Sequence, residues 1–242
     1  MATNCTNCPL RGLDLFVPLT EDEVAFMKRF KTGELTVQKG TQILMEGSNS
    51  PQLFTVLRGM GLRYKMLEEG RRQVVNFAFP GDFIGLQAGI MGEMKHSFEA
   101  STKMTLCVFA RSDIWNVFKN QPQRAFDMTW SSAAEEHFLG DALASIGQRT
   151  AIERIAWAMV RIFRRAEALN MTQGQSMPMP YRQQDLADAL GLSLVHTNKT
   201  LAKLRDRQLA SWSDGTLRLM NVEKLAQLAQ VDLEQEERRP LM

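Results

Sequence analysis

The stretch that decides the fold is YRQQDLADALGLSLVHTNKTLAKLRDRQLASWSDGTLRL, residues 181 to 219. Apolar residues follow helical spacing twice, with Gly191 between the two runs, which predicts a helix, a tight turn and a second helix. Ser193 stands where a side-chain oxygen would cap the second helix. The segment SWSDGTLRL then predicts a hairpin closed by Asp214 and Gly215. Together these features predict a winged helix-turn-helix.

A motif of this kind predicts binding to double-stranded DNA. The second helix has the width of the major groove, and its first turn would meet the base edges. Thr197, Leu201 and Leu204 form its expected buried face. Helix N-termini and nearby polar side chains suit phosphates, which fix register without reading sequence. The residues predicted to contact DNA are Arg182, Gln183, Gln184, Ser193, Leu194, Val195, His196, Asn198, Lys199 and Lys203.

Upstream, from Gly33 to about Phe109, the chain reads as short strands separated by turns. Apolar and β-branched runs such as LFTVLRG (53–59) and RQVVNFAF (72–79) alternate with Gly, Pro, Asn and Ser. These breakers recur about every ten residues, a rhythm typical of an antiparallel sandwich or roll. Residues 170 to 180, rich in breakers, read as a connector.

Between these zones, from Pro122 to about Leu169, apolar residues fall at helical intervals. The first helix is expected to run about 25 residues, long for a globular domain. This helix either packs on the roll or pairs with the same helix of a second chain in a homodimer. The homodimer is favoured because a DNA-binding protein with two-fold symmetry needs two identical chains. The residues predicted for the dimer interface are Phe126, Trp130, Ala133, Ala134, His137, Phe138 and Asp141.

Composition narrows the class of protein. The 242 residues are 44% hydrophobic and 23% charged, as in ordinary globular proteins, and the longest apolar runs are too short to cross a bilayer. The start MATNC lacks the features of an export signal, so we expect a cytoplasmic protein with no membrane partner. A net charge of +2 means that DNA binding must come from a local patch. Three cysteines do not suggest a disulfide framework.

The main alternative to a DNA-binding protein is an enzyme. A jelly-roll metal enzyme needs two or three histidines clustered with a carboxylate, but His96, His137 and His196 fall in three different zones. No Ser-His-Asp triad, P-loop or HExxH pattern is present either. We therefore expect a binding protein and no catalytic residues.

The order of roll, long helix and winged helix-turn-helix resembles the Crp/Fnr family of bacterial transcription regulators. The motifs that carry the resemblance are GTQILMEG (40–47), LFTVLRGMGLRY (53–64), FPGDFIG (79–85) and QQDLADALGLS (183–193). The resemblance implies an α+β protein that binds a palindromic operator as a homodimer and touches RNA polymerase. Its domains would be an arm and helix (1–32), a β-roll sensor domain (33–121), a dimerisation helix (122–146) and the DNA-binding domain (147–242).

Two departures from the family pattern concern recognition. Members that bind cyclic AMP have a glutamate after FIG and later an Arg-Ser pair, whereas this chain has Leu86 and His96-Ser97. Without those charged groups a cyclic phosphodiester loses its main contacts, so cyclic AMP is not expected as effector. In the recognition helix, Val195 and Lys199 replace the family's glutamate and arginine, which predicts a different operator.

The pair Cys5 and Cys8 resembles the cluster motif of the oxygen-sensing branch of this family. Cys107 stands where that branch has its distant fourth cysteine, and Asp14 takes the place of the third. The resemblance implies an oxygen-labile 4Fe-4S cluster on Cys5, Cys8, Cys107 and Asp14, held loosely because a carboxylate is a harder ligand. The alternatives are zinc, direct thiol oxidation, or incidental thiols with Cys107 as a core residue. A regulator without cofactor, constitutive or with another effector, also stays open.

Overall fold

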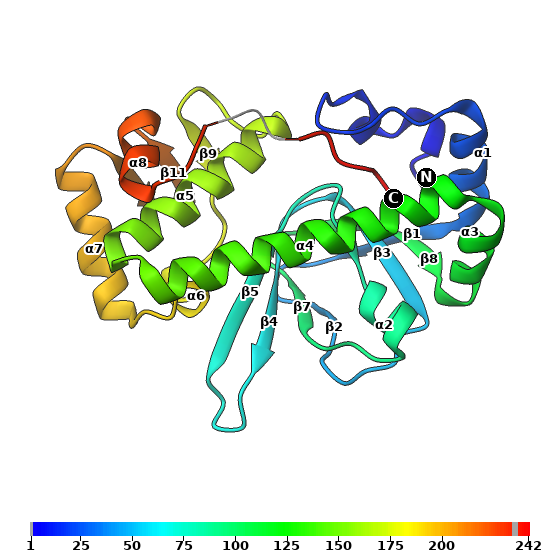
Figure 1. The fold of residues 1–242 in the computed structure, drawn as a ribbon, viewed down its shortest axis with the longest axis horizontal. Coiled ribbons are helices and arrows are strands. Elements are labelled where there is room, and N and C mark those ends of the chain that lie inside the picture. Colours follow the sequence, from blue (N-terminus) through cyan, green and yellow to red (C-terminus); the bar gives the residue numbers. More distant parts are fainter. Residues whose placement is uncertain (1, 234–236) are drawn as a thin grey trace. The chain divides into compact units, whose positions relative to one another are not determined.

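The computed structural model describes residues 2–233 and 237–242, and the chain forms two compact units (Figure 1). The first unit comprises Met1–Lys65, Asn76–Glu136 and Arg238–Met242. The second comprises Met66–Val75 and His137–Glu237. No helix within the described residues is both long and apolar enough to span a bilayer.

The predicted roll is present as two four-stranded antiparallel sheets, ordered β1-β8-β3-β6 and β2-β7-β4-β5. The strands are β1 (Lys31–Val37), β2 (Gln42–Leu44), β3 (Gln52–Arg58), β4 (Gly61–Met66), β5 (Arg72–Ala78), β6 (Phe83–Ile84), β7 (Ser97–Ala100) and β8 (Met104–Ala110). Their alternating apolar residues meet in a core that includes Phe54, Val56, Phe98, Met104 and Leu106.

Short helices surround the roll. They are the 3-10 turns η1 (Cys5–Asn7), η2 (Pro9–Gly12) and η3 (Arg111–Asp113), with α1 (Glu21–Phe30), α2 (Leu86–Met91) and α3 (Ile114–Asn120). Thr20 and Glu23 form a capping box that starts α1. A second apolar cluster beneath α1 joins Phe26, Phe30 and Phe109 to Met128 of the long helix.

The long helix α4 (Pro122–Gln148) has 27 residues, and α5 (Ala151–Ala168) follows after a second capping box formed by Thr150 and Glu153. The predicted length of about 25 residues is therefore confirmed. Phe138 near the end of α4 stacks on Trp157 of α5 with ring centroids 6.2 Å apart.

The second unit contains the predicted helix-turn-helix and hairpin. Its elements after α5 are β9 (Ser176–Pro178), α6 (Gln183–Leu190), α7 (Leu194–Asp206), β10 (Ala210–Ser213), β11 (Thr216–Leu219) and α8 (Val222–Ala229). Asp214 and Gly215 both have positive φ, as a type I′ turn requires. The connector prediction for residues 170–180 was wrong in one respect, because β9 pairs with β11 and completes a three-stranded sheet.

Two predicted boundaries also differ from the structure. The DNA-binding domain was expected to continue to residue 242, but Arg238–Met242 belong to the first unit. Residues 66–75, which hold the turn between β4 and β5 and the first half of β5, were assigned to the roll and instead group with the second unit.

Candidate nucleic-acid interface

The turn of the helix-turn-helix depends on Gly191. It follows α6 with φ of 64° and ψ of 36°, a left-handed conformation that a side chain would disfavour, and its N–H donates to the carbonyl of Ala187. Ser193 then caps α7 by accepting a 3.2 Å hydrogen bond from the N–H of His196. Both predicted roles are confirmed.

One face of α7 is buried, by Thr197, Thr200 and Leu204. The prediction named Thr197 and Leu204 correctly but missed Thr200, whose hydroxyl donates to the carbonyl of His196 at 2.8 Å. Leu201, also predicted to be buried, is only half-buried. A threonine can be buried in a helix because its hydroxyl bonds to the preceding turn, which residue type alone does not reveal.

The opposite face of α7 is open to solvent. Val195 is 65% exposed and Leu194 is 39% exposed, so this face also offers apolar surface. The exposed residues of this face are Leu194, Val195, His196, Asn198, Lys199 and Lys203. A helix with hydrogen-bond donors, a cation and an apolar side chain on one exposed face has the chemistry for base edges and the thymine methyl group.

Arg182 and Asp185 determine how α6 begins. The carboxylate of Asp185 accepts from the backbone N–H of Arg182 at 2.8 Å and from its guanidinium Nη2 at 2.8 Å. Burial opposes ionisation of Asp185, but hydrogen bonds from Arg182 and from Arg72 outweigh it, so the pKa of Asp185 is lowered. The Arg182 side chain is nevertheless exposed, as are Gln184 and, in part, Gln183.

Arg72 is a member of this site that the sequence did not reveal. Its guanidinium forms an ion pair with Asp185 and another with Asp188 at 3.0 Å, and Gln73 donates to the carbonyl of Ala189 at 3.2 Å. Arg72 lies 113 positions before Asp185, so no local pattern could predict the pair.

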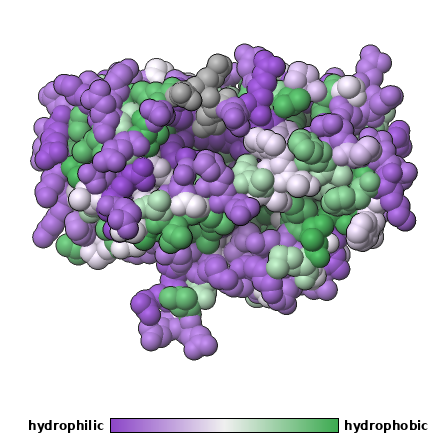
Figure 2. Space-filling model, viewed as in Figure 1, coloured by the Kyte–Doolittle hydropathy of each residue, from purple (hydrophilic) through white to green (hydrophobic). Residues whose placement is uncertain are grey.

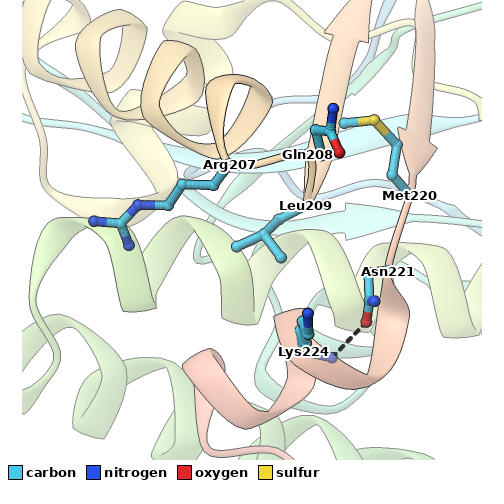
Figure 3. A pocket seen from close by; sticks show the side chains of 6 residues that line it. All are labelled: Arg207, Gln208, Leu209, Met220, Asn221 and Lys224. Atoms are coloured by element: carbon cyan, nitrogen blue, oxygen red, sulfur yellow. Dashed lines mark hydrogen bonds between the residues drawn. The ribbon is translucent and has the colours of Figure 1, made fainter.

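A shallow pocket of about 320 Å³ lies at the other end of α7 (Figure 3). It is lined by Arg207, Gln208, Leu209, Met220, Asn221 and Lys224. Asn221 uses its side chain to cap α8 at Lys224, and the lining begins at Arg207, the residue directly after α7. We assign it no ligand.

Comparisons with known proteins agree with this geometry. The family profile of the cyclic nucleotide-binding domain matches residues 34–121, and that of the Crp-like helix-turn-helix domain matches residues 153–228. The chain is 32% identical over 196 residues to the nitrogen fixation regulation protein FixK of Rhizobium meliloti, covering 80% of this chain and 85% of that protein. It belongs to the Crp/Fnr family of transcription regulators.

Other relatives extend the similarity over nearly the whole chain. The transcriptional activatory protein AadR of Rhodopseudomonas palustris is 30% identical over 230 residues, 93% of this chain and 92% of its own. The structure of FixK2 from Bradyrhizobium japonicum superposes with a TM-score of 0.70 at 25% identity, covering 81% of this chain and 96% of that chain. The protein is thus a DNA-binding regulator and not an enzyme.

The long helix α4 carries exposed apolar side chains. Phe126 is 61% exposed and Leu143 is 73% exposed, and Leu139 is also exposed. Figure 2 shows hydrophobic side chains interspersed with polar ones over the band of surface where α4 runs. The sequence predicted Phe126 as an interface residue but not Leu139 and Leu143, which lie four positions apart and therefore share one face of the helix.

The other predicted dimer residues have different surroundings. Ala133 and His137 are exposed, and Trp130 and Ala134 are half-buried. Phe138 stacks on Trp157 of the same chain, and Asp141 pairs with Arg161 at 3.0 Å. These two side chains therefore have partners within the second unit.

The roll positions that would hold cyclic AMP are engaged otherwise. Ser97 is buried and accepts the N–H of Glu46 at 3.0 Å, and Leu86 begins α2. Burial, together with the charge of Arg63, lowers the pKa of His96 to about 4, so the imidazole is neutral. Arg63 is itself buried and paired with Glu135 of α4 at 2.8 Å.

The three cysteines approach one another around Lys31. Charge interactions link Cys5 with Lys31 and Cys8, and link Cys107 with the same two residues. The Lys31 ammonium donates to the Thr3 carbonyl and to Glu34, each at 2.7 Å. Burial raises the pKa of Cys107 to about 11 and also raises that of Cys5, so both hold their protons at neutral pH.

These residues do not fit a four-iron cluster as they are folded. Such a cluster takes four ligands, chiefly thiolates. Asp14 is exposed, and the charge of Lys31 interacts with the half-buried Cys5 and Cys107. Across residues 2–233 and 237–242, no group of three or more His, Cys, Asp and Glu side chains is arranged to hold a metal ion.

Proposed function

We propose that this Crp/Fnr regulator binds a two-fold symmetric operator as a homodimer, with α7 of each chain in a major groove. The observation that supports this is the exposed face of α7, which offers Val195, Asn198 and Lys199 at the end of the helix that enters the groove first. Arg182 and the glutamines beside it would hold phosphates. Contact with RNA polymerase is part of the proposal on family grounds.

Selection of binding sites from a random DNA pool tests directly whether the protein recognises a specific DNA sequence. We expect selected sites to be palindromic, with half-sites one helical turn apart and two chains bound per site. The position read by Val195 is expected to favour thymine, whose methyl group an apolar side chain can contact. Asymmetric sites bound by one chain would overturn the proposal.

We also propose that cyclic AMP is not an effector. Two basic residues lie near the position expected for the phosphate of cyclic AMP, and neither offers it a free positive charge. His96 is neutral, and the charge of Arg63 is balanced by Glu135. Calorimetric titration with cyclic AMP is expected to give no heat of binding at millimolar concentration. A measurable heat together with tighter operator binding would refute this part.

A second candidate function is sensing of oxygen or redox state at the cysteines. It is favoured by one observation: Cys8 of the arm interacts with Cys107, about 100 positions away in the sequence, and Cys5 packs on the same apolar cluster as Cys107. Since the donor set does not fit a cluster in this fold, we derive no step through one. The competing hypothesis is a regulator that senses nothing there.

Operator binding under argon and in air separates the two hypotheses. Under the sensing hypothesis the affinity of the wild-type chain differs between the two conditions, and Cys8→Ser removes the difference. Asp14→Asn tests the remaining predicted ligand, and iron and sulfide analysis of anaerobically purified protein distinguishes a cluster from thiols. An iron-free protein that binds DNA equally in both conditions would leave the cysteines without a sensing role.

A further inference from the structure

The segment Arg238–Met242 forms an unexpected part of the first unit. Arg238–Met242 follow the DNA-binding unit in sequence but pack in the first unit. Pro240, Leu241 and Met242 are buried, and Met242 belongs to the apolar cluster that also contains Phe30, Phe109 and Met128. Burial of two large apolar side chains in so short a segment indicates a specific contact and not a chance one.

The segment is held first by the backbone of the arm. The N–H of Arg239 donates to the carbonyl of Leu15 at 2.9 Å, and the N–H of Val17 donates to the carbonyl of Arg239 at 3.0 Å. The two pieces thus form a short parallel bridge centred on Phe16. Figure 1 shows the arm and the C-terminal segment side by side, in agreement with Cys5 and Met242 sharing one cluster.

The turn at Gly81 and Asp82, part of the FPGDFIG motif, supports both pieces. A Cβ atom on Gly81 would lie 2.3 Å from the Phe16 ring, so glycine is needed for the ring to pack there. Asp82 pairs with the Arg239 guanidinium at 3.3 Å, and its other oxygen accepts the N–H of Phe79 at 2.8 Å. The hydroxyl of the buried Thr55 on β3 donates to the main-chain oxygen of Met242 at 2.5 Å.

We propose that the arm, the Gly81-Asp82 turn and the apolar cluster beneath α1 form a peptide-binding site of the first unit. Its ligand is the chain's own segment Arg238–Met242. The site recognises a basic residue at Asp82, a strand-like backbone along the arm, and two apolar side chains over the cluster beneath α1. The part of the second unit from His137 to Glu237 is then linked along the chain to the first unit on both sides, by α4 and by the docked segment. Displacement of the arm, which carries Cys5 and Cys8, would break its hydrogen bonds to Arg239 and so detach the segment from the first unit.

A synthetic peptide of residues 237–242, ERRPLM, tests the site without DNA, so its result does not depend on the proposed function. A chain that ends at Glu237 should bind the fluorescently labelled peptide saturably, and the full chain should not, because its site is filled. The peptide with Leu241→Asp should bind at least about tenfold more weakly, since it would bury a charge. A truncated chain that is folded by circular dichroism and does not bind ERRPLM would overturn the proposal.

Point variants of the full chain avoid any dependence on truncation. Leu241→Asp should speed hydrogen exchange at the Val17 amide, which donates to Arg239. Arg238→Ala is the control, because Arg238 is exposed and adjacent in sequence. Unchanged exchange at Val17 in Leu241→Asp would show that the arm does not depend on the segment, and would refute the site.

Discussion

At the scale of single residues, Lys199 is expected to contact a base and Arg182 to contact the phosphate backbone. Lys199 is exposed on α7 and can donate to guanine, so Lys199→Ala should cost about 1–3 kcal/mol at a selected operator and less on random DNA. Arg182→Ala should weaken binding to all sequences alike and reduce its salt dependence. Fluorescence anisotropy at fixed salt measures both, with Arg205→Ala at the far end of α7 as control. Equal losses on both DNAs would remove Lys199 from base readout.

Arg72 acts on the same motif through charge. Because the pKa of Asp185 is lowered in the folded chain, its ionised form adds stability above the ordinary pKa of about 4, and this stability is lost as the pH falls through the folded value. Arg72→Ala should therefore reduce the free energy of unfolding at pH 7 by about 1–3 kcal/mol, with Arg182 still paired to Asp185. The difference from wild type should shrink below about pH 4.

Urea unfolding at several pH values measures this effect. Arg71→Ala is a matched control, because Arg71 is exposed and pairs only with the exposed Glu69 among the ion pairs of the described residues. A deficit for Arg72→Ala that stayed constant from pH 7 to pH 3 would show that the loss comes from packing and not from Asp185.

At the scale of elements, α4 should hold two chains together through its exposed apolar face. Leu143→Glu would place a charge at the most exposed apolar side chain of this helix and should give a monomer by sedimentation. It is a cleaner test than a change at Phe138, whose stacking on Trp157 makes any charge there damaging within one chain. Gln148→Glu, on another side of α4, is the control. A Leu143→Glu variant that remained dimeric would exclude this face.

The same elements show what a sequence can and cannot predict. The long helix and its successor, the helix-turn-helix, five of the roll strands and the Asp214-Gly215 hairpin follow from periodicity and turn chemistry, and they were found. The short helices α2, α3 and α8 and the strands β1, β6 and β7 were not predicted. The strand β9 was missed, because three residues between breakers have no visible period. Arg72 and Arg239 were missed for a different reason: each acts on a carboxylate more than a hundred positions away. Local patterns contain no information on such pairs.

At the scale of the whole molecule, the arm and the segment Arg238–Met242 should stabilise the first unit cooperatively. Both lie on the Gly81-Asp82 turn, Phe16 by its ring and Arg239 by its charge, so loss of one loosens the support of the other. In a double-mutant cycle, Phe16→Leu and Leu241→Ala should lose about 0.5–3 kcal/mol less together than the sum of the single losses. Phe16→Leu combined with Leu225→Ala, which is buried in the second unit, should be additive. If both pairs are additive, the arm and the segment bind the turn independently, and a displaced arm could not release the segment.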